Sequence, residues 1–189
     1  MLYIQLIVQV YTINSNLHHI MTNITSDTLR VVNISEGTSV DGPGLRTSIY
    51  FAGCRHACEG CHNPQTWDFR AGRDMSIDEV LQVIDYNDFN VTFTGGDPLY
   101  SAQALVPLAQ RIRQQLHKNI WCYTGFLWED ICDDPLYRPL LEQIDVIVDG
   151  PFILAQRDTS LLFRGSANQR LIDVKASLAS GQTIEYKLM

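Results

Sequence analysis

Short stretches rich in apolar, β-branched and aromatic residues recur along the chain, and the segments between them have apolar positions at helical spacing. The first stretch, RTSIYFA at residues 46–52, predicts a β-strand. Further strands are predicted at residues 90–94, 119–124 and 145–148, and a last one at 171–174. Nearly continuous apolar strands that alternate with helices are typical of a parallel sheet covered by helices.

Helix start signals and apolar spacing predict the connections between these strands. Ser76 and Glu79 match a capping box, in which a serine caps the helix and a glutamate follows three positions later. The helix after this box has an apolar face made of Ile77, Val80, Leu81 and Ile84. A longer helix is predicted from Ser101, as its N-cap, to about Lys118, and two short helices are predicted around Pro135.

Composition and charge exclude several classes of function. The chain has 189 residues, enough for one domain with a full core, and its 46% hydrophobic content is ordinary for a globular protein. The net charge of -7 leaves no basic face for nucleic acid. Residues 1–20 lack the basic start of a signal peptide and are too often interrupted by polar residues for a membrane helix. We therefore expect a flexible extension at 1–21, a single domain at 22–189, and no nucleic-acid or membrane partner.

The most informative motif is a C-x3-C-x2-C triplet formed by Cys54, Cys58 and Cys61, within a glycine-containing loop predicted at residues 53–75. Three of five cysteines inside eight residues cannot form a disulfide framework, which favours a reducing cytoplasm. Three thiolates can hold three irons of a [4Fe–4S] cluster and leave the fourth iron open. A zinc ion with one of the two nearby histidines as fourth ligand, or buried structural cysteines, are the alternatives.

Four further segments accompany the cysteine loop: Asp-Gly-Pro-Gly-Leu-Arg at 41–46, Thr-Gly-Gly-Asp-Pro at 94–98, Val-Asp-Gly-Pro-Phe at 148–152 and Arg-Gly-Ser-Ala-Asn-Gln-Arg at 164–170. With these segments the chain resembles the radical S-adenosylmethionine (SAM) enzymes, and more narrowly the activating enzymes of glycyl-radical proteins. The segments at 148–152 and 164–170 point to activating proteins of anaerobic ribonucleoside-triphosphate reductase. The resemblance covers about residues 28–175.

The resemblance implies a fold and a chemistry. The fold would be α/β, a truncated TIM-like barrel of the radical SAM type with four to five βα units. The three cysteines would ligate a [4Fe–4S] cluster, and reduction of this cluster would cleave SAM to methionine and a 5′-deoxyadenosyl radical. The residues implied to bind SAM are Gly60, Cys61, His62, Gly95, Gly96 and Asp97.

Two of these residues depart from the common family pattern. The family usually has glutamate at the position of Asp97 and an aromatic residue at the position of His62. A solvated Asp97 in a simple strand-to-helix turn is the structural alternative. Asp149, at the end of a predicted strand, could contact SAM or equally be solvated.

The implied protein substrate is an anaerobic ribonucleoside-triphosphate reductase, on which the enzyme would generate a glycyl radical. The implied electron donor is a reduced flavodoxin or a similar protein. Three other functions remain open at this point: an activase of another glycyl-radical enzyme, a small-molecule radical SAM enzyme similar to carboxy-deazaguanine synthase, and a non-catalytic zinc or iron–sulfur binding module.

Overall fold

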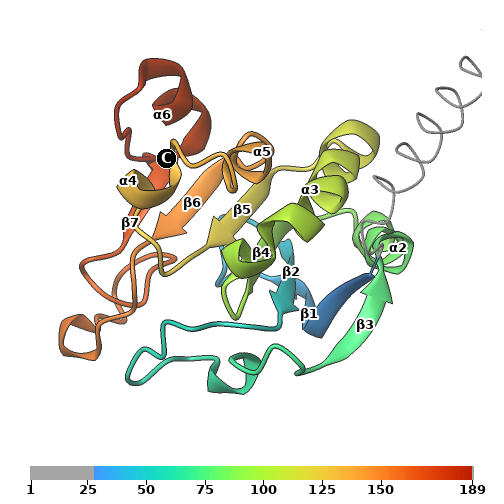
Figure 1. Cartoon of the computed structure of the whole chain (residues 1–189), viewed down its shortest axis with the longest axis horizontal. Helices are drawn as coiled ribbons and strands as arrows, with labels where there is room; N and C mark the ends of the chain where they lie inside the picture. Colours follow the sequence, from blue (N-terminus) through green and yellow to red (C-terminus); the bar gives the residue numbers. More distant parts are fainter. Residues whose placement is uncertain (1–27, 189) are drawn as a thin grey trace, which may run out of the picture.

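The computed structural model describes residues 28–188, which form one seven-stranded sheet with helices α2, α3 and α5 packed on one face (Figure 1). The expected extension at 1–21 lies outside the described residues. The strands are β1 Thr28–Thr38, β2 Arg46–Phe51, β3 Arg73–Ser76, β4 Asn90–Gly95, β5 Ile120–Tyr123, β6 Val146–Asp149 and β7 Arg170–Asp173. The helices are α2 Ile77–Asn87, α3 Ala102–Arg111, α4 Trp128–Ile131, α5 Arg138–Leu141 and α6 Val174–Ser180.

The sheet is mixed, with strand order β3-β1-β2-β4-β5-β6-β7. The four central strands β2, β4, β5 and β6 run parallel, as predicted. The prediction of a parallel sheet is wrong toward both edges, where β1 pairs antiparallel with β2 and β3, and β7 pairs antiparallel with β6. A parallel partner needs a long crossover. Residues 39–45 are too few for one, so β2 returns directly along β1.

The helices follow the predicted spacing with two differences. The capping box is confirmed, because the Ser76 hydroxyl accepts from the backbone N–H of Glu79 and the Glu79 carboxylate accepts from that of Ser76. Ser101 makes no side-chain capping bond, and the Asp97 carboxylate instead accepts from Leu99 N at the start of a 3-10 turn. The long helix also ends earlier than predicted, because α3 gives way to a π-helix at Ile112–Leu116. None of the described helices is long and apolar enough to cross a membrane.

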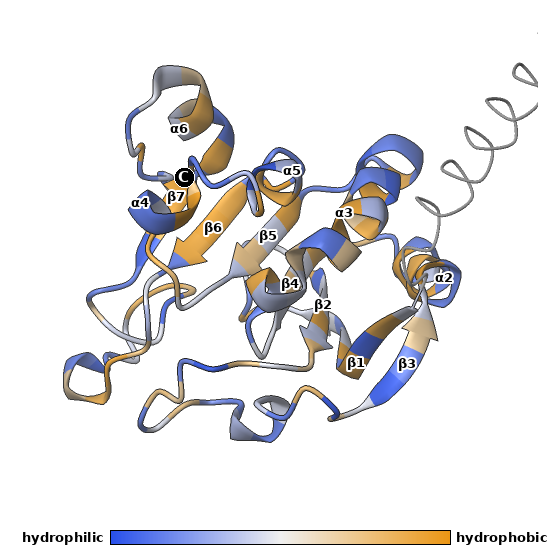
Figure 2. Cartoon of the chain, viewed as in Figure 1, coloured by the Kyte–Doolittle hydropathy of each residue, from blue (hydrophilic) through white to orange (hydrophobic). Residues whose placement is uncertain are grey.

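The apolar core lies between the sheet and its helices. Ile49, Phe93, Cys122 and Ile147 alternate onto the covered face of the four parallel strands and are essentially inaccessible to solvent. β6 is coloured hydrophobic over most of its length (Figure 2). Burial of each such side chain contributes roughly 1.5–3 kcal/mol. Cys122 is therefore a core residue, as its place in an apolar run predicts.

The opposite face of the sheet carries polar residues at β2 and β4. Strand alternation turns Arg46 and Tyr50 away from the helices. The Arg46 guanidinium donates to Thr92 Oγ1 (2.6 Å) and Val91 O (2.5 Å), and it lies 5.3 Å from the Trp121 ring centre. Burial lowers the pKa of Arg46 to about 10. This polar face leads to the ends of the parallel strands, where the site lies.

Candidate functional site

A cavity of about 180 Å³ opens where the parallel strands end. Its wall includes all three cysteines of the triplet together with Gly95 and Gly96 from the end of β4. Carboxyl ends of parallel strands are the usual position of active sites in α/β proteins. The cysteine triplet and the glycine pair, both identified from the sequence, therefore lie together at the carboxyl ends of the parallel strands.

The cysteine loop takes up a tight conformation. Gly53 and Gly60 have positive φ angles (101° and 73°), and so does Ala57 (49°). The N–H of Cys61 donates to the carbonyl of Cys58, which closes a turn between these two cysteines. All three thiols of the triplet are free and partly exposed, so they are available as ligands.

The surroundings of Cys54 favour the protonated thiol in the absence of a bound cation. Burial raises the pKa of the Cys54 thiol, and the charge of Asp97 adds to the rise. A hydrogen bond from the backbone of His56 acts in the opposite direction. Binding of positively charged iron would offset the desolvation of the thiolate, since metal binding releases the thiol proton.

The three cysteines fit a multi-iron cluster better than a single zinc ion. A single zinc ion requires all of its sulfur ligands to lie about 2.3 Å from the same metal centre. Within residues 28–188, no three His, Cys, Asp or Glu side chains are arranged to hold one metal ion. Of the two candidate fourth ligands, His56 is already hydrogen-bonded to Asp97, and the ring of His62 packs against Phe152 at 5.1 Å between ring centres. A cluster offers each thiolate its own iron and needs no fourth protein ligand.

The glycine pair lets β4 approach the cysteine loop. The N–H of Gly96 donates to Phe51 O (2.8 Å), and that of Asp97 donates to Gly53 O (2.9 Å). A Cβ on Gly96 would lie 2.5 Å from the carbonyl oxygen of Gly53, and Gly95 has a positive φ of 98°. The absence of these side chains thus brings two strand ends into backbone contact and leaves backbone atoms facing the cavity.

Asp97 is not solvated. Its side chain is 2% exposed, and its carboxylate accepts four hydrogen bonds, one from its own turn and three from neighbouring loops. These donors are Leu99 N at 3.0 Å, Thr124 Oγ1 at 2.9 Å, Gly125 N at 2.9 Å and His56 Nε2 at 2.7 Å. Sequence reasoning missed the link to His56, because 41 residues separate the two positions.

The opposite wall of the cavity comes from the chain between β6 and β7. Phe152, Gly165 and Gln169 line it, facing His62. The Gln169 amide donates to Gly150 O (3.0 Å) and its carbonyl accepts from Gly165 N (2.8 Å). The two segments at 148–152 and 164–170, which share a family resemblance, are therefore joined by hydrogen bonds beside the cavity.

Asp149 neither lines the cavity nor faces solvent. Its carboxylate is fully buried and accepts from Trp128 N (2.9 Å) and from the Arg170 guanidinium (3.1 and 2.5 Å). Arg170 also pairs with Glu129 at 2.7 Å, and this hydrogen bond is the main reason that the pKa of Glu129 falls to about 2. The strand-end residue that lines the cavity is Gly150.

The Asp-Gly-Pro-Gly segment reaches the rim of the cavity through Asp41. Its carboxylate accepts from the Tyr50 hydroxyl (3.2 Å), and its carbonyl accepts from Thr92 Oγ1 (2.8 Å). Burial and the nearby Asp41 raise the pKa of Tyr50 to about 12. These two hydrogen bonds fix the turn before β2 to the polar face of the sheet, opposite the helices.

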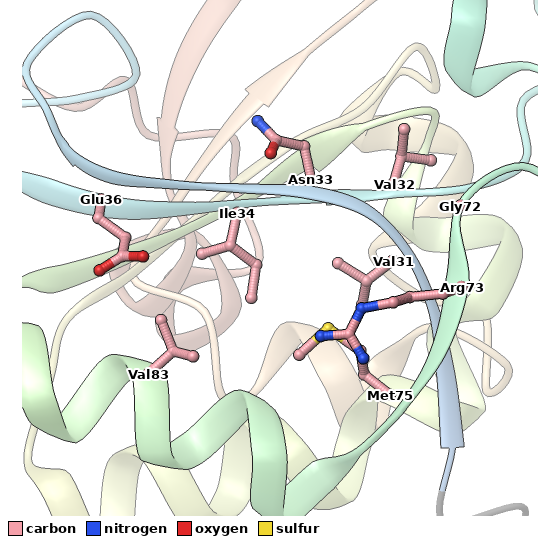
Figure 3. A pocket seen from close by; sticks show the side chains of 9 residues that line it. All are labelled: Val31, Val32, Asn33, Ile34, Glu36, Gly72, Arg73, Met75 and Val83. Atoms are coloured by element: carbon pink, nitrogen blue, oxygen red, sulfur yellow. The ribbon is translucent and has the colours of Figure 1, made fainter.

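A larger cavity of about 410 Å³ lies elsewhere, between β1, β3 and α2 (Figure 3). The side chains of Ile34 and Val83 point toward one another across it, and Arg73 and Met75 come from β3. Its lining offers no cysteine or histidine. The chemistry-bearing residues of the sequence are gathered at the smaller cavity instead.

Comparison with known proteins agrees with this site. A family described as a 4Fe-4S single cluster domain matches residues 40–172. The anaerobic ribonucleoside-triphosphate reductase-activating protein of Haemophilus influenzae is 38% identical over 141 residues, covering 69% of this chain and 88% of that protein. The protein of the same name from Escherichia coli K12 is 35% identical, covering 69% and 89%.

A phage protein and a solved structure are also similar to the chain. The phage T4 protein of the same name is 36% identical, covering 70% of this chain and 86% of its own length. The crystal structure of QueE from Escherichia coli aligns with 52% of this chain and 53% of its own, with a TM-score of 0.45 and 18% identity. The family match covers most of the described fold and includes all three cysteines of the cavity. The chain belongs to the family of anaerobic ribonucleoside-triphosphate reductase-activating proteins.

Proposed function

We propose that this protein is a radical SAM oxidoreductase that activates an anaerobic ribonucleoside-triphosphate reductase by generating its glycyl radical. The main support for this proposal is that Cys54, Cys58 and Cys61 line one cavity. In addition, the curated relatives of the chain are named anaerobic ribonucleoside-triphosphate reductase-activating proteins. The protein substrate would be the reductase, and the electron donor a reduced flavodoxin or a similar protein. A cytoplasmic location, with no nucleic-acid or membrane partner, accords with the acidic charge and the free thiols.

The cofactor roles follow from the lining of the cavity. The three cysteines would hold three irons of a [4Fe–4S] cluster, and SAM would occupy the space beside Cys61, His62, Gly95 and Gly96. Gly60, which the resemblance also implies, is not among the residues that line the cavity and instead faces Leu154. When bound and reduced, the cluster supplies the electron that cleaves SAM to methionine and a 5′-deoxyadenosyl radical. Asp97 would contribute to this site through the loops that its carboxylate joins.

The residues of this chain would mainly orient the cofactors and exclude water. Backbone atoms at the two glycines can approach a ligand closely, because no side chain stands in the way. On the opposite side lie the rings of Phe152, which is half-buried, and His62, which is exposed, and a bound SAM molecule would pack against them. Exclusion of water protects a radical from side reactions, which is the main task left to the protein when cofactors perform the chemistry.

We further propose that the sheet is an open, truncated TIM-like barrel. The sheet has four parallel strands, β2, β4, β5 and β6, which match the lower limit of the expected four to five βα units. The antiparallel strands at both edges would stop the barrel from closing. The open side would leave room for a loop of a large protein substrate.

Electron paramagnetic resonance (EPR) on the anaerobically reconstituted and reduced protein tests the function. We expect a cluster signal that SAM perturbs, followed by a doublet-type glycyl radical when the organism's anaerobic reductase is added. A cluster that SAM perturbs without any radical on the reductase would assign the chemistry to another substrate. A colourless, zinc-containing protein without a cluster signal would refute the enzyme assignment.

A further inference from the structure

Asp97 joins three loops that follow three different strands. Its carboxylate accepts from Leu99 N (3.0 Å) in its own loop after β4, and from Thr124 Oγ1 and Gly125 N (both 2.9 Å) in the loop after β5. Its backbone N–H donates to Gly53 O (2.9 Å) after β2, and the fourth bond to its carboxylate comes from His56 Nε2 (2.7 Å) in the middle of the cysteine loop. Every atom that contacts this carboxylate is a donor, so the carboxylate is fully used within the protein.

His56 is held in place by packing as well as by this bond. Its ring meets Phe126 edge-on, with 4.7 Å between ring centres, and lies 5.6 Å from the ring of Tyr100. A Cβ on Gly125 would come within 2.5 Å of His56 Cδ2, so the imidazole occupies the space that this glycine leaves open. The side chain retains 17% exposure.

The bond also stands alone in its part of the loop. Among the described residues, His56 provides the one side-chain hydrogen bond that runs from residues 55–60 to another loop. The neighbouring Ala57 has a positive φ of 49°, a conformation that an alanine rarely adopts without support from its surroundings. Cys54 and Cys58 flank His56 by two positions on either side.

We propose that His56 and Asp97 are positioning residues, whose hydrogen bond sets the shape of the cysteine loop before the cluster is bound. The inference rests on the cluster site proposed above. In this arrangement Asp97 acts through His56 and through the loop after β5, and His56 is not an iron ligand. A loop that is already ordered loses less conformational entropy when the cluster binds. Loss of the hydrogen bond therefore weakens cluster uptake.

The bond itself is tested by a double-mutant cycle on the cluster-free protein, with urea unfolding as the measurement. His56→Met removes the donor at similar size, and Asp97→Ala removes the acceptor. We expect His56→Met to lower the folding equilibrium constant about tenfold in the wild-type background, and to have little effect beside Asp97→Ala. An equal effect in both backgrounds would overturn the proposal.

The consequence for the cluster is tested by iron content and EPR after anaerobic reconstitution. His56→Met should retain several-fold less cluster than wild type, and His56→Gln, whose amide can donate from a similar place, should recover most of the loss. This comparison stands even if Asp97→Ala does not fold. His117→Met, at an exposed histidine between the π-helix and β5, is the matched control and should load normally.

Three results separate the inference from the function on which it rests. Normal cluster loading by His56→Met would overturn the positioning role while leaving the cluster assignment intact. Pulsed EPR that reveals a cluster-coupled nitrogen in wild type, lost in His56→Gln, would also overturn it by making His56 a ligand. A wild-type protein that takes up no cluster would refute the proposed function, while the unfolding cycle would still test the bond.

Discussion

At the scale of single residues, the site depends on glycines, because their lack of a side chain lets other groups come close. Gly96 and Gly125 lie where a Cβ would come within 2.5 Å of the Gly53 carbonyl and of the His56 ring, respectively. The first clash is with backbone, which cannot rotate away, whereas the second is with a side chain that can move. The glycine after β4 is thus the stricter requirement.

Gly96→Ala should therefore displace the start of the cysteine loop. We expect it to destabilise the fold by about 1–3 kcal/mol in urea unfolding, the typical cost of overpacking, and to reduce iron content after reconstitution. Gly181→Ala is the control, because this glycine has a positive φ of 68° with nothing within 4 Å. It should cost stability through backbone strain and leave iron uptake unchanged. Equal iron loss in both variants would contradict the local explanation.

The cysteines divide into two groups by location. Replacing Cys54, Cys58 or Cys61 singly with alanine should abolish cluster binding and SAM cleavage, since each would leave one iron without its ligand. Cys132→Ala and the core variant Cys122→Ala should keep the cluster, although the latter should lose stability. Iron and sulfide analysis of the five variants checks this division, and loss of the cluster in Cys122→Ala would disprove the ligand assignment.

At the scale of secondary structure, the sequence predicts the four central strands and the edge strand β7, but not β1 and β3. β2, β4, β5 and β6 pair on both sides and carry strong apolar patterns, so they are visible in the sequence. β1 has many half-exposed positions, and β3 has only four residues. Such strands form because of the strands they pair with rather than because of their own composition.

The difference between local motifs and contacts between distant residues explains which parts of the site could be predicted. The cysteine triplet and Gly95-Gly96 are local motifs at strand ends, and the sheet brings them together as expected. The bonds of Asp97 to His56 and of Asp149 to Arg170 connect distant positions, at 41 and 21 residues of separation. Without the fold, nothing in the sequence pairs these particular residues.

Helix α4 is tied to β6 and β7 by an ion-pair network that should respond to acid. Because the hydrogen bond from Arg170 lowers the pKa of Glu129 from 4.5 to about 2, the pair stabilises the fold above pH 4.5 and loses this effect as the pH falls toward 2. Glu129 is half exposed, so screening keeps the contribution under about 1 kcal/mol.

Urea unfolding of wild type and Glu129→Gln across this range tests the network. The stability difference between the two proteins should be largest at neutral pH and should shrink between pH 4.5 and 2. A difference that stays constant with pH would show that the carboxyl charge does not matter there. High salt should also reduce the difference, because the pair is only partly buried.

At the scale of the whole molecule, the cavity gathers residues from widely separated parts of the chain. Its lining begins at Asp41, includes the cysteines and the glycine pair, and ends at Gln169. A ligand that contacts all these segments favours the folded state over the unfolded one. Ligand binding and global stability should therefore be linked.

SAM should raise the unfolding temperature of the reconstituted protein under anaerobic conditions. At a concentration about 100 times its dissociation constant, the expected stabilisation is about 2.7 kcal/mol. Differential scanning calorimetry with and without SAM measures the shift. The cluster-free protein and the Cys58→Ala variant are the controls, and an equal shift in them would mean that SAM binds without the cluster.

The spread of the cavity along the chain also has a consequence for how the protein matures in the cell. The cysteines emerge from the ribosome in the first third of the chain, whereas the opposite wall, with Phe152 and Gln169, emerges near the end. The thiols are thus exposed throughout translation, before the pocket that protects them exists. A cluster that needs both walls of the pocket would accordingly be held only after the later wall has been synthesised, and until then three neighbouring thiols would be open to oxidation.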